Sequence, residues 1–246
     1  MTRLTSGGGY GNPLWTVDGR YIVFRAAQGM FWTRVDGTSQ PQALTSSSTQ
    51  QIPWSFTGDG KRLAFVEPNS ASRAVIWTVS VDSNASGLQA GNPEVFLEAP
   101  FNVRGPMFSP DGRWIAYPSD ESGRYSVDVI AFPDKHGKQR ILSGAGYPAW
   151  SRNGHELFFW KFGMRRNQLM STSYKEHGDS FVAEKPHVWS ENRFILFSTT
   201  RPYDPAPDGK HVVALMPAET AETQDHVIFL LNFFDELRRR APLNAN

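Results

Sequence analysis

Residues 106–117 read Pro-Met-Phe-Ser-Pro-Asp-Gly-Arg-Trp-Ile-Ala-Tyr, and this stretch decides the fold. An Asp-Gly pair in such a setting favours a tight hairpin turn, because glycine readily takes a positive φ. The apolar residues after the turn alternate, with Ile115 and Tyr117 two positions apart, as in a strand with one buried face. The stretch therefore predicts two antiparallel strands that are joined at Asp111 and Gly112.

The same pattern occurs five times along the chain, each time as an Asp-Gly or Asn-Gly pair ahead of an alternating apolar run. Repeats of about 40 to 50 residues with four strands each are typical of β-propellers. The sequence therefore predicts one all-β domain over residues 1–246, a β-propeller of four-stranded antiparallel blades. The pairs begin at Asp18, Asp59, Asp111, Asn153 and Asp208, with spacings of 41, 52, 42 and 55 residues.

Each repeat also supplies candidates for the outer strands of a blade, and we count five blades. The expected blades span residues 10–48, 51–98, 103–144, 146–190 and 201–232. The expected third strands span residues 30–35, 74–81, 126–132, 168–174 and 226–231. The expected fourth strands span residues 42–45, 94–97, 139–142 and 186–189. A short C-terminal helix is expected over residues 233–240.

The fifth repeat has no fourth strand of its own, and the N-terminus offers a substitute. Residues 3–5 read Arg-Leu-Thr and match residues 43–45, Ala-Leu-Thr, of the first blade. We expect residues 1–6 to form a closing strand beside residues 226–231, so that both chain ends build the last blade. Such closure removes an exposed sheet edge that invites pairing with another chain.

Aromatic residues recur at one position of the repeat, three residues before the Asp or Asn. Large rings bury much apolar area and dominate the packing of a core. We interpret these four as packing between neighbouring blades. They are Trp15, Phe56, Phe108 and Trp150.

The composition excludes several classes of protein. Hydrophobic residues make up 39% of the chain and aromatic residues 13%, which favours a folded core of many short strands over disorder. The net charge is +1, so no nucleic-acid partner is expected, because a general nucleic-acid binder needs a basic face. The chain has no Cys, and no apolar run reaches the roughly 20 residues of a membrane helix. We therefore expect no membrane insertion by this chain and a soluble protein.

No motif with catalytic chemistry appears in the sequence. A kinase Gly-rich loop with its lysine strand, a Gly-x-Ser-x-Gly elbow and a His-x-His pair are all missing. Asp120 and Glu121 are adjacent, so on an extended strand they point to opposite sides and make a poor pair for glycoside cleavage. We expect no catalytic residues, no metal site and no cofactor. The alternative is a carbohydrate-active enzyme, a glycoside hydrolase or polysaccharide lyase, with two acids or a His cluster converging at the propeller axis.

A binding site is expected at one mouth of the central channel, where the innermost strands converge. The residues that enter these strands form a polar and partly cationic set, which suits an anionic ligand or a peptide carboxylate. The set is Asn12, Gln51, Arg104, Tyr147 and Arg201, with Asp204 as a further candidate beside an inner strand.

Residues 108–117 and 119–124 resemble the TolB-like, WD40-like propeller repeat of bacteria. Residues 105–240 are similar to the C-terminal propeller of bacterial serine/threonine kinases, chiefly through residues 150–159, 203–209 and 227–237. The resemblance covers nearly the whole chain. It implies six blades as an alternative to five, a periplasmic or extracytoplasmic location, and membership of a longer, membrane-anchored kinase-type protein.

Together these observations predict a non-enzymatic binding or sensor module. Its partner is expected to be a protein, a peptide or a small ligand, recognised at a propeller face or in the axial funnel. A purely architectural domain of a receptor-type kinase is a further alternative.

Overall fold

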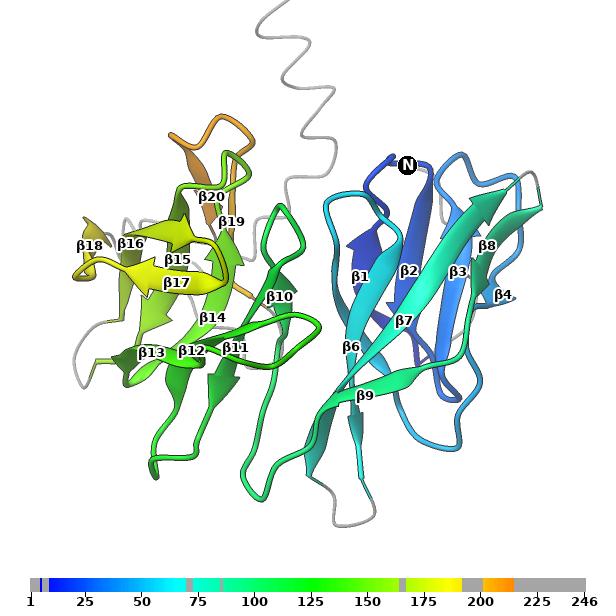
Figure 1. Ribbon diagram of the computed structural model, residues 1–246. Helices are drawn as coiled ribbons and strands as arrows, with labels where there is room; N and C mark the ends of the chain where they lie inside the picture. The colour runs from blue at the N-terminus through cyan, green and yellow to red at the C-terminus, as the bar shows by residue number, and fades with distance from the viewer. Residues whose placement is uncertain are drawn as a thin grey trace, which may run out of the picture.

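The computed structural model describes residues 5, 9–69, 73–84, 86–163, 167–191 and 201–214, and within these ranges it contains strands and no helix (Figure 1). The first blade contains β1 (Gly11–Trp15), β2 (Tyr21–Arg25), β3 (Met30–Arg34) and β4 (Gln42–Ala43). The second contains β5 (Ile52–Phe56), β6 (Arg62–Pro68), β7 (Ala74–Asn84), β8 (Gly87–Ala90) and β9 (Glu94–Leu97). The third contains β10 (Met107–Phe108), β11 (Trp114–Ser119), β12 (Ser126–Ala131) and β13 (Gln139–Ser143). The fourth contains β14 (Ala145–Trp150), β15 (Glu156–Lys161), β16 (Gln168–His177), β17 (Ser180–Ala183) and β18 (His187–Ser190). The fifth contains β19 (Tyr203–Pro205) and β20 (Val212–Ala214).

In the first and third blades, strands that follow one another along the chain are also neighbours in the sheet. The first sheet has the order β1-β2-β3-β4 and the third blade the order β10-β11-β12-β13, and every pair in them is antiparallel. The expected third and fourth strands of the first four repeats correspond to β3, β4, β7, β9, β12, β13, β16 and β18. Figure 1 shows the first two blades (blue to cyan) on one side of the molecule and the third and fourth (green to yellow) on the other.

The second and fourth blades carry an extra strand that the sequence does not predict. Their third strands, β7 and β16, run past the end of the blade, and the extended parts pair with β8 and β17 as two-stranded arms. Each arm reaches the preceding blade. A Cβ atom on Gly87 of β8 would lie 2.0 Å from the Trp32 ring, and the Phe181 ring of β17 lies 5.2 Å from that of Trp114. The arms therefore cover aromatic residues of the first and third blades.

The turn between the first two strands of a blade is held by the same hydrogen bonds in successive repeats. Asp111 Oδ1 accepts bonds from the Ser109 hydroxyl at 2.5 Å and from the Arg113 backbone N–H at 3.1 Å. The Ser109 oxygen accepts the Trp114 N–H at 2.9 Å, and Gly112 has a φ of 75°. The matching backbone bond is made at Asp18, Asp59, Asn153 and Asp208. These Asp and Asn side chains therefore have a structural role in the turns.

Neighbouring blades are joined near the axis through backbone oxygens of the inner strands. The buried Ser55 hydroxyl in the second blade donates to the Pro106 carbonyl ahead of β10, at 2.9 Å. Trp150 in the fourth blade donates through Nε1 to the Met107 carbonyl at 2.8 Å. Because these carbonyls belong to inner strands, the bonds fix the spacing of the blades around the axis.

The hydrophobic core consists of clusters that lie between adjacent blades. Phe108 and Trp150 are buried there and Phe56 is half-buried, which agrees with the expected packing between blades. The expectation is wrong for Trp15, which is 55% exposed. Neighbouring residues of a strand point to opposite faces, and it is Leu14 that packs into the cluster between the first and second blades.

The proposed ring closure lies outside the described residues. Of residues 1–6 only Thr5 is described, and residues 226–231 and the expected helix at 233–240 are not among the described ranges. The blade count of five, with six as the alternative, and the closing strand therefore stay predictions.

The turn chemistry gives a stability prediction. Replacing Ser109, which is 1% exposed, by Ala removes the oxygen that accepts the Trp114 N–H, and an unpaired buried donor costs about 1–3 kcal/mol. We expect Ser109→Ala to lower the unfolding free energy by about this amount in urea titrations. The matched control is Ser122→Ala, because Ser122 is exposed on a turn of the same blade, and its effect should stay within about 0.5 kcal/mol. Equal effects of the two substitutions would contradict this account of the turn.

Candidate functional site

The inner strands of the first and fourth blades carry a bulge at the place where they approach the axis. The pairing register shifts between Gly11 and Leu14 in β1, and again between Gly146 and Ala149 in β14. The residue before the proline of each bulge has a left-handed backbone, with φ of 51° at Asn12 and 53° at Tyr147. Such conformations are uncommon for residues other than glycine and concentrate where a bulge redirects a side chain. Both residues belong to the predicted channel-mouth set.

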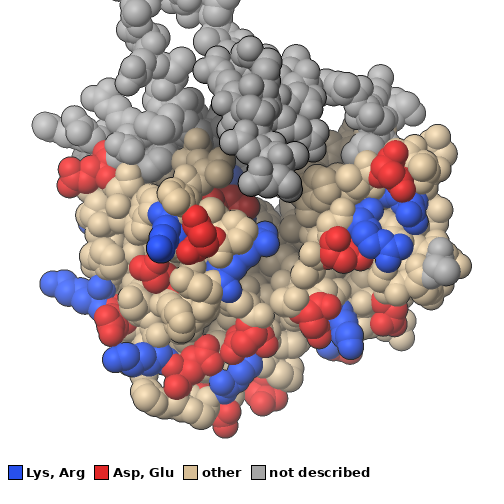
Figure 2. Space-filling view, turned by 90° about the horizontal axis from the view of Figure 1, so that it is seen from above, with Lys and Arg blue, Asp and Glu red and all other residues tan. Residues whose placement is uncertain are grey.

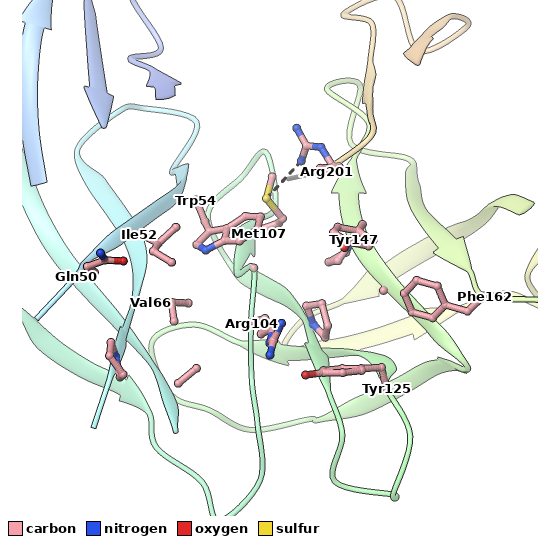
Figure 3. Close-up of a pocket in the computed structure, with 16 residues that line it drawn as sticks. Gln50, Ile52, Trp54, Val66, Arg104, Met107, Tyr125, Tyr147, Phe162 and Arg201 are labelled. Carbon is pink, nitrogen blue, oxygen red and sulfur yellow. Dashed lines mark hydrogen bonds between the residues drawn. The ribbon is translucent and has the colours of Figure 1, made fainter. Parts of the chain in front are cut away.

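A cavity of about 370 Å3, which we call the axial cavity, opens between the inner strands of the second, third and fourth blades. Its wall is largely apolar and aromatic, and the labelled side chains of Figure 3 surround it from several blades. Of the predicted residues, Arg104, Tyr147 and Arg201 line it together. The aromatic and sulfur-containing side chains of the wall are Trp54, Met107, Tyr125, Tyr147 and Phe162.

The two arginines of the cavity differ in how their charge is balanced. The Arg201 guanidinium donates to Asp204 Oδ1 at 2.6 Å, to the Tyr203 carbonyl at 2.9 Å and to Met107 Sδ at 3.4 Å. The Arg104 guanidinium lies 5.6 Å from the centre of the Tyr125 ring, and it makes no ion pair with any residue in the described ranges. Arg104 is therefore the charge in this cavity that lacks an acidic partner among the described residues.

Tyr147 offers a neutral hydroxyl to the same cavity. Partial burial raises the pKa of this phenol, and nearby Arg104 offsets only part of that effect. The Tyr147 backbone is held from the next blade, because the buried Tyr203 hydroxyl donates to its carbonyl at 2.6 Å. Tyr147 thus keeps its proton at neutral pH and can donate or accept a hydrogen bond.

A second cavity, of about 400 Å3, lies between β1 and the β19–β20 hairpin. Asn12, Arg201 and Asp204 line it, so this is where the structure places the remaining polar candidates. Trp54 and Arg201 line both cavities and form the wall between them. Asp204 is 65% exposed here, while Arg201 is 22% exposed.

Gln51 is placed apart from the other predicted site residues. It is 3% exposed, lines neither cavity, and its side chain donates to Glu67 Oε2 at 2.8 Å. Ser47 and Thr49 also donate to the Glu67 carboxylate. Gln50, the residue before Gln51, lines the axial cavity instead, because the side chains of consecutive residues diverge. The network anchors the connection between the first two blades.

Acidic and imidazole groups are missing from the wall of the axial cavity as far as the structure describes it. His155 and His177 line a separate surface hollow with Asp111 and Glu176, between the third and fourth blades. Among the described residues, no group of three or more His, Asp and Glu is arranged to hold a metal ion. The converging acids or histidines that a carbohydrate-active site needs therefore do not occur in the described lining.

Charges on the face seen in Figure 2 are of both signs and intermixed. Basic and acidic side chains lie close to one another over this face, with uncharged surface between them. The charges on this face therefore form no extended field of one sign that would attract a charged ligand. No helix in the described part of the chain is long and apolar enough to span a membrane.

Most of the aromatic wall of the cavity cannot be predicted from the sequence. Trp54, Tyr125 and Phe162 come from three different blades and are not at one repeated position, so no periodicity marks them. Trp54 follows Pro53 and lies at the register shift between Pro53 and Ser55 in β5, and the bulges of β1 and β14 also contain a proline, so the proline was a usable signal.

Solved structures of other proteins share this architecture. The chain is similar to a putative TolB from Agrobacterium tumefaciens, with a TM-score of 0.59 and 16% identity over 75% of this chain and 69% of that one. It is also similar to an oligogalacturonate lyase in complex with manganese, with a TM-score of 0.53 and 12% identity over 87% and 75% of the two chains. A Mycobacterium tuberculosis puromycin-hydrolyzing peptidase gives a TM-score of 0.50 and 14% identity over 71% of this chain and 31% of that one.

These likenesses confirm the predicted fold class: the chain has an all-β fold of the TolB-like propeller type. Identities of 12–16% show a common fold, and they do not transfer an activity or a partner. No protein-family model matches the chain, and no curated protein matches its sequence.

The Glu67 network gives a pH prediction. Partial burial acts to raise the pKa of Glu67, but the hydrogen bonds from Ser47, Thr49 and Gln51 outweigh it and hold the pKa below its ordinary value of 4.5. A depressed carboxylate pKa stabilises the fold above that ordinary value, and the contribution is lost as the pH falls through the native pKa. Glu67→Gln should therefore be less stable than the wild type at neutral pH, with the difference shrinking as the pH falls below 4.5.

Urea titrations of both proteins over a series of pH values measure this difference. Glu191→Gln removes the same charge from an exposed position and serves as the control, with little effect at any pH. A Glu67→Gln deficit that is independent of pH would show that packing, and not the charged carboxylate, carries the contribution.

Proposed function

We propose that this protein is a non-enzymatic binding module whose ligand occupies the axial cavity. The observation that carries the proposal is the cavity wall, which combines several aromatic rings with arginine side chains and presents no acid or imidazole among its described residues. Concave, largely apolar sites with few polar groups are typical of ligand binding. Acid–base chemistry requires titratable groups within hydrogen-bond reach of the substrate, and this wall supplies a neutral phenol and guanidinium groups instead.

The proposal extends to the biological setting of the module. A protein or peptide partner, or a small ligand, fits a site at the mouth of a channel. The resemblance of residues 105–240 to kinase-associated propellers supports a sensor role in a longer, membrane-anchored protein, with the propeller outside the cytoplasm. A purely architectural role is less well supported, because such a role needs no cavity lined by aromatic side chains.

Two of the structural likenesses support the enzymatic alternative. The oligogalacturonate lyase and the puromycin-hydrolyzing peptidase show that propeller chains of this type occur in enzymes. We expect no turnover of oligogalacturonate and none of a peptide anilide by this protein. Product release that disappears on substituting one residue of the axial cavity would overturn the proposal.

Binding by the cavity is tested with indole, an uncharged aromatic probe. Ala74 lines the cavity, and a Phe side chain there fills part of the space that the probe needs. We expect ligand-observed NMR to detect indole binding to the wild type and to lose it in Ala74→Phe. The matched control is Val95→Phe, because Val95 lies on β9 and is 41% exposed away from the cavity.

A second variant covers the case in which Ala74→Phe fails to fold. Phe162 lines the cavity and is 38% exposed, so Phe162→Ala removes an aromatic contact without a buried hole. One such contact is worth about 0.5–1.5 kcal/mol, so indole should bind roughly two- to tenfold more weakly. Indole binding that is equal in the wild type and in both variants would place the site elsewhere and overturn the proposal.

A further inference from the structure

The axial cavity contains one positively charged side chain without an acidic partner among the described residues. This side chain determines which ligand charge fits the cavity. Arg201 is already neutralised by Asp204 at 2.6 Å, whereas Arg104 faces no acid among the residues that the structure describes. In a largely apolar wall, an anion with a single charge is balanced by Arg104. A doubly charged phosphate in the same place would retain a second negative charge that Arg104 does not balance.

The position of Arg104 favours a planar anion. Its guanidinium lies over the Tyr125 ring, at 5.6 Å from the ring centre, and Figure 3 shows the two side chains together at the cavity. Contact with a ring face leaves the N–H donors at the edge of the guanidinium free. That edge matches the two oxygens of a carboxylate in a bidentate arrangement. The phenol of Tyr147, which stays protonated at neutral pH and lies near Arg104, supplies a further hydrogen-bond donor to the same cavity (Figure 3).

The rest of the wall defines the body of the ligand. Trp54, Met107 and Phe162 line the same cavity as Arg104, and aromatic pairs and sulfur–aromatic contacts favour a flat ring there. The volume of about 370 Å3 lies at the lower end of the range for ligand pockets, so it suits one ring system with a short acidic arm. A free ammonium group would find no carboxylate in the described part of this wall.

We propose that the cavity recognises a carboxylate joined to an aromatic body, with the carboxylate on Arg104 and the ring among Trp54, Met107 and Phe162. This inference rests on the proposed function, because it names the ligand class of the same site. The chemistry is shared by two sources, a free aromatic acid without an ammonium group and the C-terminal residue of a peptide that ends in an aromatic side chain.

The central test compares N-acetyl-tryptophan with its amide by isothermal titration calorimetry. The two probes differ only in the negative charge, and we expect the acid to bind the wild type at least about tenfold more tightly, as charge-assisted hydrogen bonds predict. In Arg104→Gln the two affinities should agree within about twofold. Arg152→Gln, at an exposed turn of the fourth blade outside the cavity, is the matched control and should keep the preference for the acid.

Further probes separate the sources of the carboxylate. Free tryptophan should bind more weakly than N-acetyl-tryptophan, because its ammonium group has no acidic partner in the described wall. Acetyl-Gly-Gly-Trp with a free C-terminus assigns the site to a chain end if it binds more tightly than N-acetyl-tryptophan. Weaker binding of this peptide assigns the site to a free acid.

Several outcomes would overturn the inference. Equal binding of acid and amide to the wild type would do so, and so would a preference that Arg104→Gln retains. If only Arg201→Gln loses the preference for the acid over the amide, the anion is bound by Arg201 and not by Arg104. Indole distinguishes failure of this inference from failure of the proposed function. If indole still binds in the cavity, the proposed binding module is retained and only the carboxylate inference fails. A cavity that binds neither indole nor N-acetyl-tryptophan contradicts both proposals.

Discussion

In the first four blades, a turn that joins a hydroxyl to an Asp or Asn side chain sets the register of the first two strands, and the rest of the structure depends on that register. At Asp111 the carboxylate holds the Ser109 hydroxyl and the Arg113 N–H, and the same hydroxyl fixes the first N–H of β11. A slip of one residue would turn every side chain of a strand to the opposite face. Because the core clusters lie between blades, such a slip would place polar residues against the next blade and expose the aromatic ones.

The register also shapes the site. Bonds from Ser55 and Trp150 to backbone oxygens hold the inner strands at a fixed spacing, and the bulge at Tyr147 turns this residue out of the regular pattern toward the axis. The resulting space is apolar, aromatic and poor in titratable groups, with one unbalanced cation at Arg104 in the described part of its wall. This combination of groups supports the proposed binding of an anion with an apolar body better than it supports acid–base catalysis.

Much of the fold follows from the sequence because it depends on local periodicity. In the first four repeats, the turn pairs and the alternation after them locate the first three strands, and the fourth strands occur where they are expected. Features that depend on contacts between blades do not follow. The sequence predicts neither β8 nor β17, and it gives no sign that Trp15 is exposed while Trp150 is buried. Likewise, three of the predicted channel residues share the axial cavity, while Gln51 is drawn into hydrogen bonds with Glu67, which only the folded chain brings near.

The central claim, that the axial cavity is the binding site and Arg104 its anion contact, is tested most directly by a crystal structure of the protein with N-acetyl-tryptophan. The account predicts the indole ring among Trp54, Met107 and Phe162, with both carboxylate oxygens within hydrogen-bond distance of the Arg104 guanidinium. A ligand bound with its carboxylate turned away from Arg104, or an empty axial cavity at saturating ligand, would contradict it.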